Sequence, residues 1–193
     1  MHARAWVIAA LLAAGTASAQ TAAASAIALR TPYIQQSWEG CGSASIAMVM
    51  QYWDAQEHHP IPASADAATI QSQLYSRAAQ GIRASSMEAY LRAQGYRVFA
   101  FSGQWSDLAH HLALGRPLIV SLAASGAHGP LHFVVVTGID TTRGYVYIQD
   151  PARKPMLRLS REGFESEWKG AHNWMLLAVP QTPASPAAGV ASH

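Results

Sequence analysis

The stretch QSWEGCGSASIAMVMQYW, residues 36–53, contains the only cysteine of the chain. Cys41 lies between two glycines and is followed by small and apolar residues from Ser43 to Trp53. Such a run favours a buried helix that would begin at the cysteine. Unpaired backbone N–H groups at a helix start carry partial positive charge and favour a thiolate over a thiol. The stretch therefore predicts a helix that presents a reactive thiol; the alternative is a small buried hydrophobe.

The composition is that of a globular protein with one domain. The chain has 193 residues, of which 50% are hydrophobic and 12% are charged. The net charge of +2 is spread along the sequence without a basic cluster, so we expect no nucleic-acid partner. A single cysteine excludes the paired cysteines of a structural metal site, and we expect neither a metal nor another cofactor.

Residues 1–19 have the pattern of a secretory signal peptide. Arg4 supplies a short positive segment, residues 6–14 form an apolar core too short to span a bilayer, and residues 17–19 read ASA, a small-residue cleavage site. Cleavage there predicts a periplasmic or secreted protein without a membrane span in the mature chain. The alternative is an uncleaved anchor. An exported chain with one cysteine cannot form an internal disulfide, which leaves a reactive nucleophile as one explanation of the thiol.

The remaining chain divides into three parts. Residues 20–30 are rich in alanine and are expected to be a flexible lead-in, residues 31–180 a single domain, and residues 181–193 a disordered tail. The domain starts with a short extended segment that ends in Gln35 and Gln36, shortly before the cysteine. A side-chain amide here could donate a hydrogen bond to an oxyanion, although glutamines on loops are usually just solvated.

The first half of the domain is expected to be helical. Residues 64–80 have helical spacing, and Ser85 with Glu88 forms a capping box that opens a helix ending at Gly95. A strand at 96–101 and a helix at 105–114 follow. Histidine pairs stand at 58–59 and 110–111, but adjacent helical residues do not share a face and no ligand flanks them, so we expect surface histidines.

The second half is expected to form strands and one short helix. The strands are 118–123, 131–140, 145–151, 155–159 and 173–179, and the helix is 160–168. A four-residue turn joins the second and third of these strands as an antiparallel hairpin. Helices followed by an antiparallel sheet predict an α+β domain in two layers.

His132 begins one strand of this hairpin and Asp150 ends its partner. If positions 140 and 145 pair, Asp150 lies opposite residue 135, about three positions (~10 Å) from His132. Direct contact then requires a bulge or another register. Taken alone, His132 could be a histidine at the edge of the core, and Asp150 before a proline could simply cap a turn.

Four segments together resemble a known family. They are TPYIQQSWEGCGSASIAMVMQYW (31–53), GRPLIVSL (115–122), LHFVVVTGID (131–140) and YVYIQDP (145–151). The order of glutamine, Cys-Gly at a helix start, His-Phe-Val-Val-Val and Asp-Pro resembles the papain-like, bacteriocin-processing cysteine peptidases that remove double-glycine leaders. The resemblance is closer to their stand-alone secreted members than to those fused to transporters.

The resemblance implies a papain-like cysteine peptidase fold, with N-terminal helices packed on a C-terminal antiparallel sheet. Cys41 would be the nucleophile, His132 its general base and acid, and Asp150 the residue that orients the imidazole. An upstream glutamine would complete the oxyanion hole; Gln36 matches the stand-alone members and Gln35 the members fused to transporters.

Two positions depart from the family pattern. Ser43 stands where many relatives have proline or leucine, which should be harmless at a helix start. Glu39 would raise the pKa of the thiol if its carboxylate pointed inward.

The expected function is a secreted cysteine peptidase that acts on a peptide or protein through an acyl-enzyme. Two alternatives keep the fold. A cell-wall endopeptidase or acyl transferase would use the same residues on another acyl group, and a catalytically silent peptide-binding module would have no need of an activated cysteine.

Overall fold

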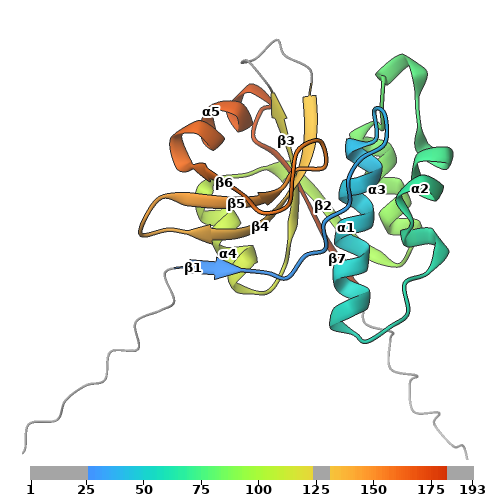
Figure 1. The fold of residues 1–193 in the computed structure, drawn as a ribbon, viewed down its shortest axis with the longest axis horizontal. Helices are drawn as coiled ribbons and strands as arrows, with labels where there is room; N and C mark the ends of the chain where they lie inside the picture. The colour runs from blue at the N-terminus through green and yellow to red at the C-terminus, as the bar shows by residue number, and fades with distance from the viewer. Residues whose placement is uncertain (1–25, 124–130, 182–193) are drawn as a thin grey trace, which may run out of the picture.

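The computed structural model describes residues 26–123 and 131–181 (Figure 1). Within them, seven strands form one antiparallel sheet in the order β2–β7–β3–β4–β5–β6, with β1 paired to β4. The strands are β1 (Ala26–Ala28), β2 (Tyr96–Ser102), β3 (Leu118–Ala123), β4 (Leu131–Asp140), β5 (Tyr145–Gln149), β6 (Leu157–Ser160) and β7 (Trp174–Pro180). The helices are α1 (Cys41–Gln56), α2 (Ala67–Leu74), α3 (Ala84–Ala93), α4 (Trp105–Ala113) and α5 (Arg161–Gly170), with short 3₁₀ helices η1 (Ala63–Ala65) and η2 (Arg77–Ala79). The expected signal peptide and the tail beyond residue 181 lie outside the described residues.

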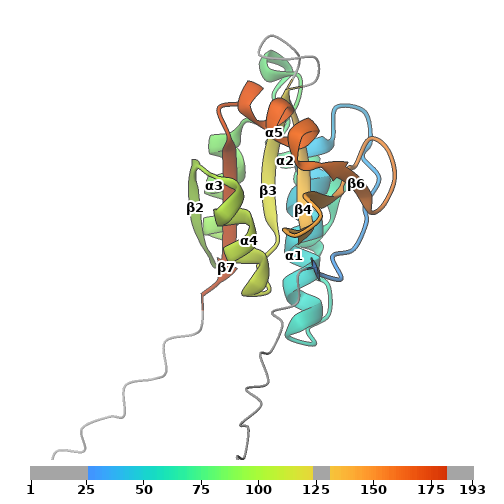
Figure 2. The ribbon, with the colours of Figure 1, turned by 90° about the vertical axis from the view of Figure 1, so that its left-hand side faces the viewer.

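Helices cover both faces of the sheet. Helices α1, α2 and α3 gather on one side (Figure 1), and Figure 2 shows α4 and α5 in front of the central strands. Two hydrophobic clusters correspond to these two sides, one with residues of α1 to α3 and one with residues of α4 and α5. The expected α+β class, with N-terminal helices packed on an antiparallel sheet, is confirmed. The prediction of two layers is wrong, because α4 and α5 form a third layer on the other face of the sheet.

The central strands are buried from both sides. Along β3, Ile119 packs in the cluster of α1 to α3, whereas Leu118 and Val120 pack in the cluster of α4 and α5. All six residues of β3 are buried. A strand covered on both faces needs apolar residues at every position, which explains its continuous apolar sequence.

Two helical predictions are corrected by the structure. The helix expected at 64–80 is broken into η1, α2 and η2, because Asp66 and Tyr75 adopt extended backbone conformations at the two ends of α2. Asp66 caps α2 by accepting a hydrogen bond from the backbone N–H of Thr69 at 2.8 Å. The capping box expected at Ser85 is wrong. The N-cap of α3 is Arg83, two residues earlier, and its side chain makes no capping hydrogen bond.

Part of the expected flexible lead-in is ordered. Residues 26–28 form β1 and pair with the end of β4, where Ile27 lies opposite Ile139. The strands approach closely because Gly138 has no side chain; a Cβ atom there would lie 2.5 Å from the carbonyl oxygen of Ile27. In the described ranges, no helix is both long and apolar enough to cross a membrane.

Candidate active site

Cys41 occupies the first position of α1. Gly40 is the N-cap, and the hydroxyl of Ser43 donates a hydrogen bond to the Gly40 carbonyl oxygen at 2.9 Å. Ser43 is therefore compatible with the helix start, as expected. Gly42 leaves room for a neighbour, since a Cβ atom there would lie 3.0 Å from Cβ of Ile82. The thiol is partly buried at the positive end of a 16-residue helix.

A bulge in β4 brings His132 and Asp150 together. Next to the turn, Asp140 pairs with Tyr145, as the sequence predicts. The register shifts between Val136 and Gly138, so that Val136 pairs with Ile148 and Gly138 with Tyr147. The extra residue moves the end of β5 one position closer to the start of β4. His132 Nε2 and Asp150 Oδ1 lie 2.7 Å apart.

His132 is also a hydrogen-bond partner of the Cys41 thiol. Since Nε2 of His132 is engaged by Asp150, Nδ1 is the ring nitrogen left for this contact. Burial alone would raise the pKa of Cys41, but the hydrogen bond and charge of His132 and the backbone N–H groups of Phe133 and Gly42 outweigh it. The pKa of the thiol therefore lies below its ordinary value. This geometry favours a thiolate beside an imidazolium.

The same contacts act on His132 and Asp150. Burial would lower the pKa of His132, but hydrogen bonds to Asp150 and Cys41 and their negative charges raise it to about 9. Burial would raise the pKa of Asp150, yet the hydrogen bond and charge of His132, with smaller contributions from the Ala152 N–H and the Arg153 guanidinium, hold it below the ordinary value. Asp150 is thus an ionised, buried carboxylate that stabilises the imidazolium.

The two candidate glutamines differ in their surroundings. The Gln35 side chain is exposed, whereas Gln36 is half-buried. The backbone N–H of Gln36 donates to the carbonyl oxygen of Pro151 at 3.0 Å, which ties Gln36 to the residue that follows Asp150. Its Oε1 atom is buried and has no hydrogen-bond partner among the described residues. These surroundings favour Gln36 over Gln35 for a role at the site.

The carboxylate of Glu39 is bound by another side chain, that of Tyr75. Glu39 adopts a left-handed backbone conformation with φ of 53°, and its carboxylate accepts a hydrogen bond from the hydroxyl of Tyr75. This bond raises the pKa of Tyr75 above its ordinary value. Tyr75 is a residue that the sequence did not single out, since nothing in the sequence links it to a glutamate 36 positions earlier. Its ring lies 6.5 Å from that of Trp38, centre to centre.

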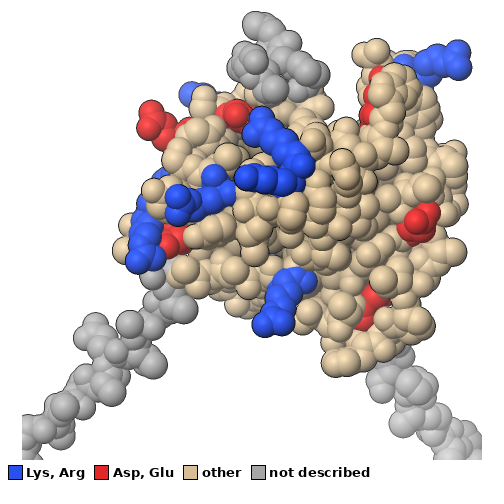
Figure 3. All heavy atoms as spheres, viewed as in Figure 1, with Lys and Arg blue, Asp and Glu red and all other residues tan. Residues whose placement is uncertain are grey.

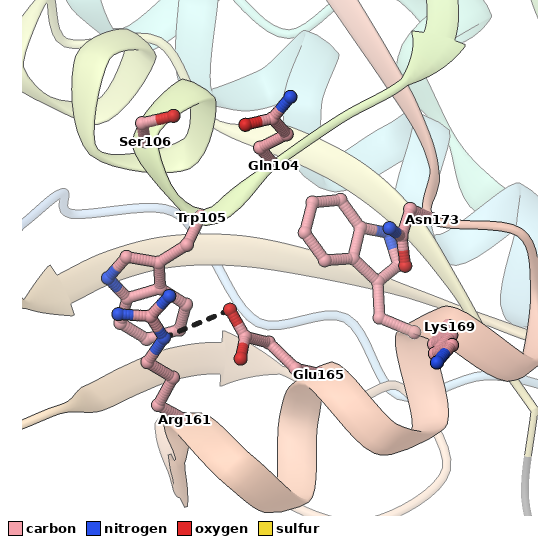
Figure 4. A pocket seen from close by; sticks show the side chains of 8 residues that line it. Gln104, Trp105, Ser106, Arg161, Glu165, Lys169 and Asn173 are labelled. Carbon is pink, nitrogen blue, oxygen red and sulfur yellow. Dashed lines mark hydrogen bonds and ion pairs between the residues drawn. The ribbon is translucent and has the colours of Figure 1, made fainter.

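A pocket of about 530 Å³ lies between α4 and α5 (Figure 4). Its lining does not include Cys41 or its partners. The Arg161 guanidinium lies 4.9 Å from the centre of the Trp105 ring, and its Nε donates to Glu165 at 3.0 Å. Arg161 and Glu165 pair with each other, and the lining residues hold no cysteine or histidine. The candidate nucleophile therefore remains Cys41.

The paired histidines take part in local contacts. His59 Nδ1 lies 3.3 Å from a carboxylate oxygen of Glu57, and the His111 ring packs edge-on against Phe101. In the described part of the chain, no group of three or more histidine, cysteine or acidic side chains is placed to hold a metal ion.

The chain is similar to known proteins in sequence and in fold. A sequence model of the family described as Peptidase_C39 like matches residues 28–174. No curated protein matches the chain at a significant level.

Three solved structures share the fold. A Bacillus anthracis protein described as a C39-like peptidase is 17% identical, with a TM-score of 0.65 over 81% of this chain and 98% of that chain. The peptidase domain of Streptococcus ComA, a bifunctional ABC transporter, is 22% identical, with a TM-score of 0.60 over 78% and 98%. A double-glycine-motif protease of an AMS/PCAT transporter, in complex with its leader peptide, is 22% identical, with a TM-score of 0.60 over 80% and 94%. The papain-like fold expected from the sequence is confirmed.

Proposed function

The chain belongs to the Peptidase_C39-like family and is a cysteine-type peptidase, and we propose that it hydrolyses peptide bonds through a Cys41–His132–Asp150 triad. The observation that carries the proposal is the hydrogen bond of 2.7 Å between His132 Nε2 and Asp150 Oδ1. It leaves the other imidazole nitrogen for the thiol, which is the order of contacts that an activated nucleophile requires.

The first half of the reaction forms an acyl-enzyme. His132 takes the proton of the Cys41 thiol, and the thiolate sulfur attacks the carbonyl carbon of the scissile peptide bond. The resulting tetrahedral oxyanion accepts hydrogen bonds from the Cys41 backbone N–H and the Gln36 side-chain amide. His132 then gives its proton to the leaving amine as the C–N bond breaks, and the acyl group stays on sulfur.

The second half releases the acyl group. His132 removes a proton from water, and the hydroxide attacks the thioester carbonyl carbon. The C–S bond breaks, Cys41 leaves as the thiolate, and the new carboxyl product departs. Asp150 stays ionised throughout and stabilises the imidazolium each time it forms.

We place this activity outside the cytoplasm. The support is the pattern of residues 1–19, with a positive start, a short apolar core and the sequence ASA before residue 20. N-terminal sequencing of the protein recovered from a periplasmic fraction tests this. We expect a chain that begins at Gln20; a chain that keeps Met1 would contradict export by a cleaved signal peptide.

The activity itself is tested by incubating the purified mature protein with a peptide library and analysing the products by mass spectrometry. We expect cleavage at a defined set of sequences, abolished in a Cys41→Ala variant with an unchanged melting temperature. Cleavage that persists in the Cys41→Ala variant would contradict the assignment of the nucleophile.

A further inference from the structure

The positive charge of the chain is concentrated in one segment. The whole sequence has thirteen lysines and arginines against eleven acidic residues, whereas residues 141–160 have four against one. The rest of the chain, with nine against ten, is slightly negative. The even spread of charge expected from the sequence is therefore wrong at this surface.

The four basic side chains lie on one exposed surface, over β5, β6 and the loops at their ends. We call this surface the basic face; it consists of Arg143, Arg153, Lys154 and Arg158, all of them exposed. Figure 3 shows Lys and Arg side chains running as a stripe across this part of the molecule. Asp140 and Asp150 pair with Arg143 and Arg153 and offset part of this charge, but their side chains are only 2% and 6% exposed. A ligand at this surface therefore meets the basic groups and not the carboxylates.

Several of the basic groups are held in place. Arg143 lies 3.2 Å from Asp140, and Arg153 lies 3.5 Å from Asp150. The guanidinium of Arg158 lies 4.5 Å from the centre of the Tyr145 ring. A guanidinium has five N–H donors in a fork, so a single carboxylate contact leaves donors free for a ligand. Groups held this way lose less side-chain entropy when an anion binds.

The basic face begins at the catalytic centre. Arg153 contacts the carboxylate that binds His132, and the other three basic residues follow along the β5–β6 pair. The five residues of β5 span roughly 17 Å at the usual rise per strand residue, the length of about five extended peptide residues. A peptide that leaves the thiol over the 150–156 loop would therefore pass along the basic face.

From this arrangement we propose that the basic face binds an acidic stretch of the peptide substrate. The inference rests on the proposed function, because it assigns the substrate of that site. The basic face would select peptides that have several aspartate or glutamate residues within a few positions of the scissile bond. Coulomb attraction to exposed groups is screened by salt over ~10 Å at 0.1 M, so the preference should weaken as ionic strength rises.

The test uses the full mature chain with Cys41→Ala, so that binding is measured without cleavage. Fluorescence anisotropy compares a fluorescein-labelled 12-residue peptide with four consecutive glutamates and the same peptide with four glutamines, at 25 mM and 300 mM NaCl. We expect tighter binding of the glutamate peptide at low salt, and equal binding of the two at high salt. Equal affinities at low salt would overturn the proposal.

Two charge-matched variants locate the effect. Lys154→Gln with Arg158→Gln removes two charges from the basic face, and Arg97→Gln with Arg116→Gln removes two charges elsewhere. We expect the first variant to weaken binding of the glutamate peptide about fivefold or more, and the second to leave it unchanged. Melting temperatures show that both are folded. Equal effects of the two variants would overturn the assignment to the basic face.

Membranes are the competing partner. Membrane binding is measured by co-sedimentation with vesicles of phosphatidylglycerol and phosphatidylcholine. Vesicles of phosphatidylcholine alone are the comparison. Vesicle binding that depends on Lys154 and Arg158, with no preference for the glutamate peptide, would overturn the proposal. The protein could also bind the glutamate peptide at the basic face and cleave no peptide. That result would support the binding role of the basic face and contradict only the proposed peptidase activity.

Discussion

His132 and Asp150 contact each other directly because β4 contains one more residue than its partner strand needs. The hydrogen bond between His132 Nε2 and Asp150 Oδ1 is 2.7 Å long. An unbroken hairpin would place Asp150 opposite residue 135, about 10 Å from His132. The shift between Val136 and Gly138 removes one position of that separation, and the two side chains span the remainder.

This contact predicts a graded loss of activity. In Asp150→Asn the side chain keeps its shape but loses the charge that stabilises the imidazolium, whereas His132→Ala removes the base itself. We expect kcat/KM to fall in both variants, with a loss about a hundredfold smaller for Asp150→Asn. Steady-state assays with one cleaved peptide measure the two values. Equal losses would indicate that Asp150 does more than orient and stabilise the imidazole.

The two glutamines provide a matched pair of variants. Gln36→Ala should lower kcat on the order of 10²- to 10³-fold, because an oxyanion loses one hydrogen-bond donor, with little change in KM. Gln35→Ala should leave kcat within a fewfold of the original value, since that side chain is exposed. Single-substrate kinetics on both variants separate these outcomes. The reverse order would assign the oxyanion donor to Gln35.

The pKa shifts define a pH range for activity. The reactive pair needs a deprotonated Cys41, whose pKa is lowered, and a protonated His132, whose pKa is raised to about 9. The rate should therefore rise through the lowered pKa of the thiol and fall as pH passes about 9. A profile of kcat/KM from pH 4 to 10.5 measures both limits. A rate that falls already near pH 6.5 would show that His132 titrates at its ordinary value.

Tyr75 is expected to act as a positioning residue for the thiol. In Tyr75→Phe the carboxylate of Glu39 loses its hydrogen bond and is free to approach Cys41, two residues away. A nearby negative charge disfavours the thiolate, so the pKa of Cys41 should rise. Adding Glu39→Gln should reverse the rise, because the charge is gone. Alkylation rates against pH report this pKa; identical profiles for the original protein and Tyr75→Phe would contradict the role.

The local order of elements could be predicted from the sequence because it follows from nearby residues. The apolar run after Cys41 and the turn between Asp140 and Tyr145 each carry their own signal, and both elements are present. The break of the 64–80 segment was missed because helical spacing continues through Tyr75, which is held in an extended conformation at the end of α2.

Distant contacts left no comparable trace in the sequence. The bulge before Gly138 depends on the register of two strands, and the bond between Tyr75 and Glu39 joins residues from separate elements. The third layer was missed for a similar reason. An apolar strand such as β3 indicates burial on both faces, but its sequence does not say which helices provide the cover.

The central claim is that His132 activates Cys41, and the pH dependence of Cys41 alkylation by iodoacetamide tests it most directly. The mature protein is compared with a His132→Ala variant, and the rate is followed from pH 4 to 10. We predict that the thiol reacts with an apparent pKa well below the ordinary value of about 8.5, and that the pKa returns toward that value in the variant. A thiol that titrates at its ordinary pKa and is indifferent to His132 would contradict the account.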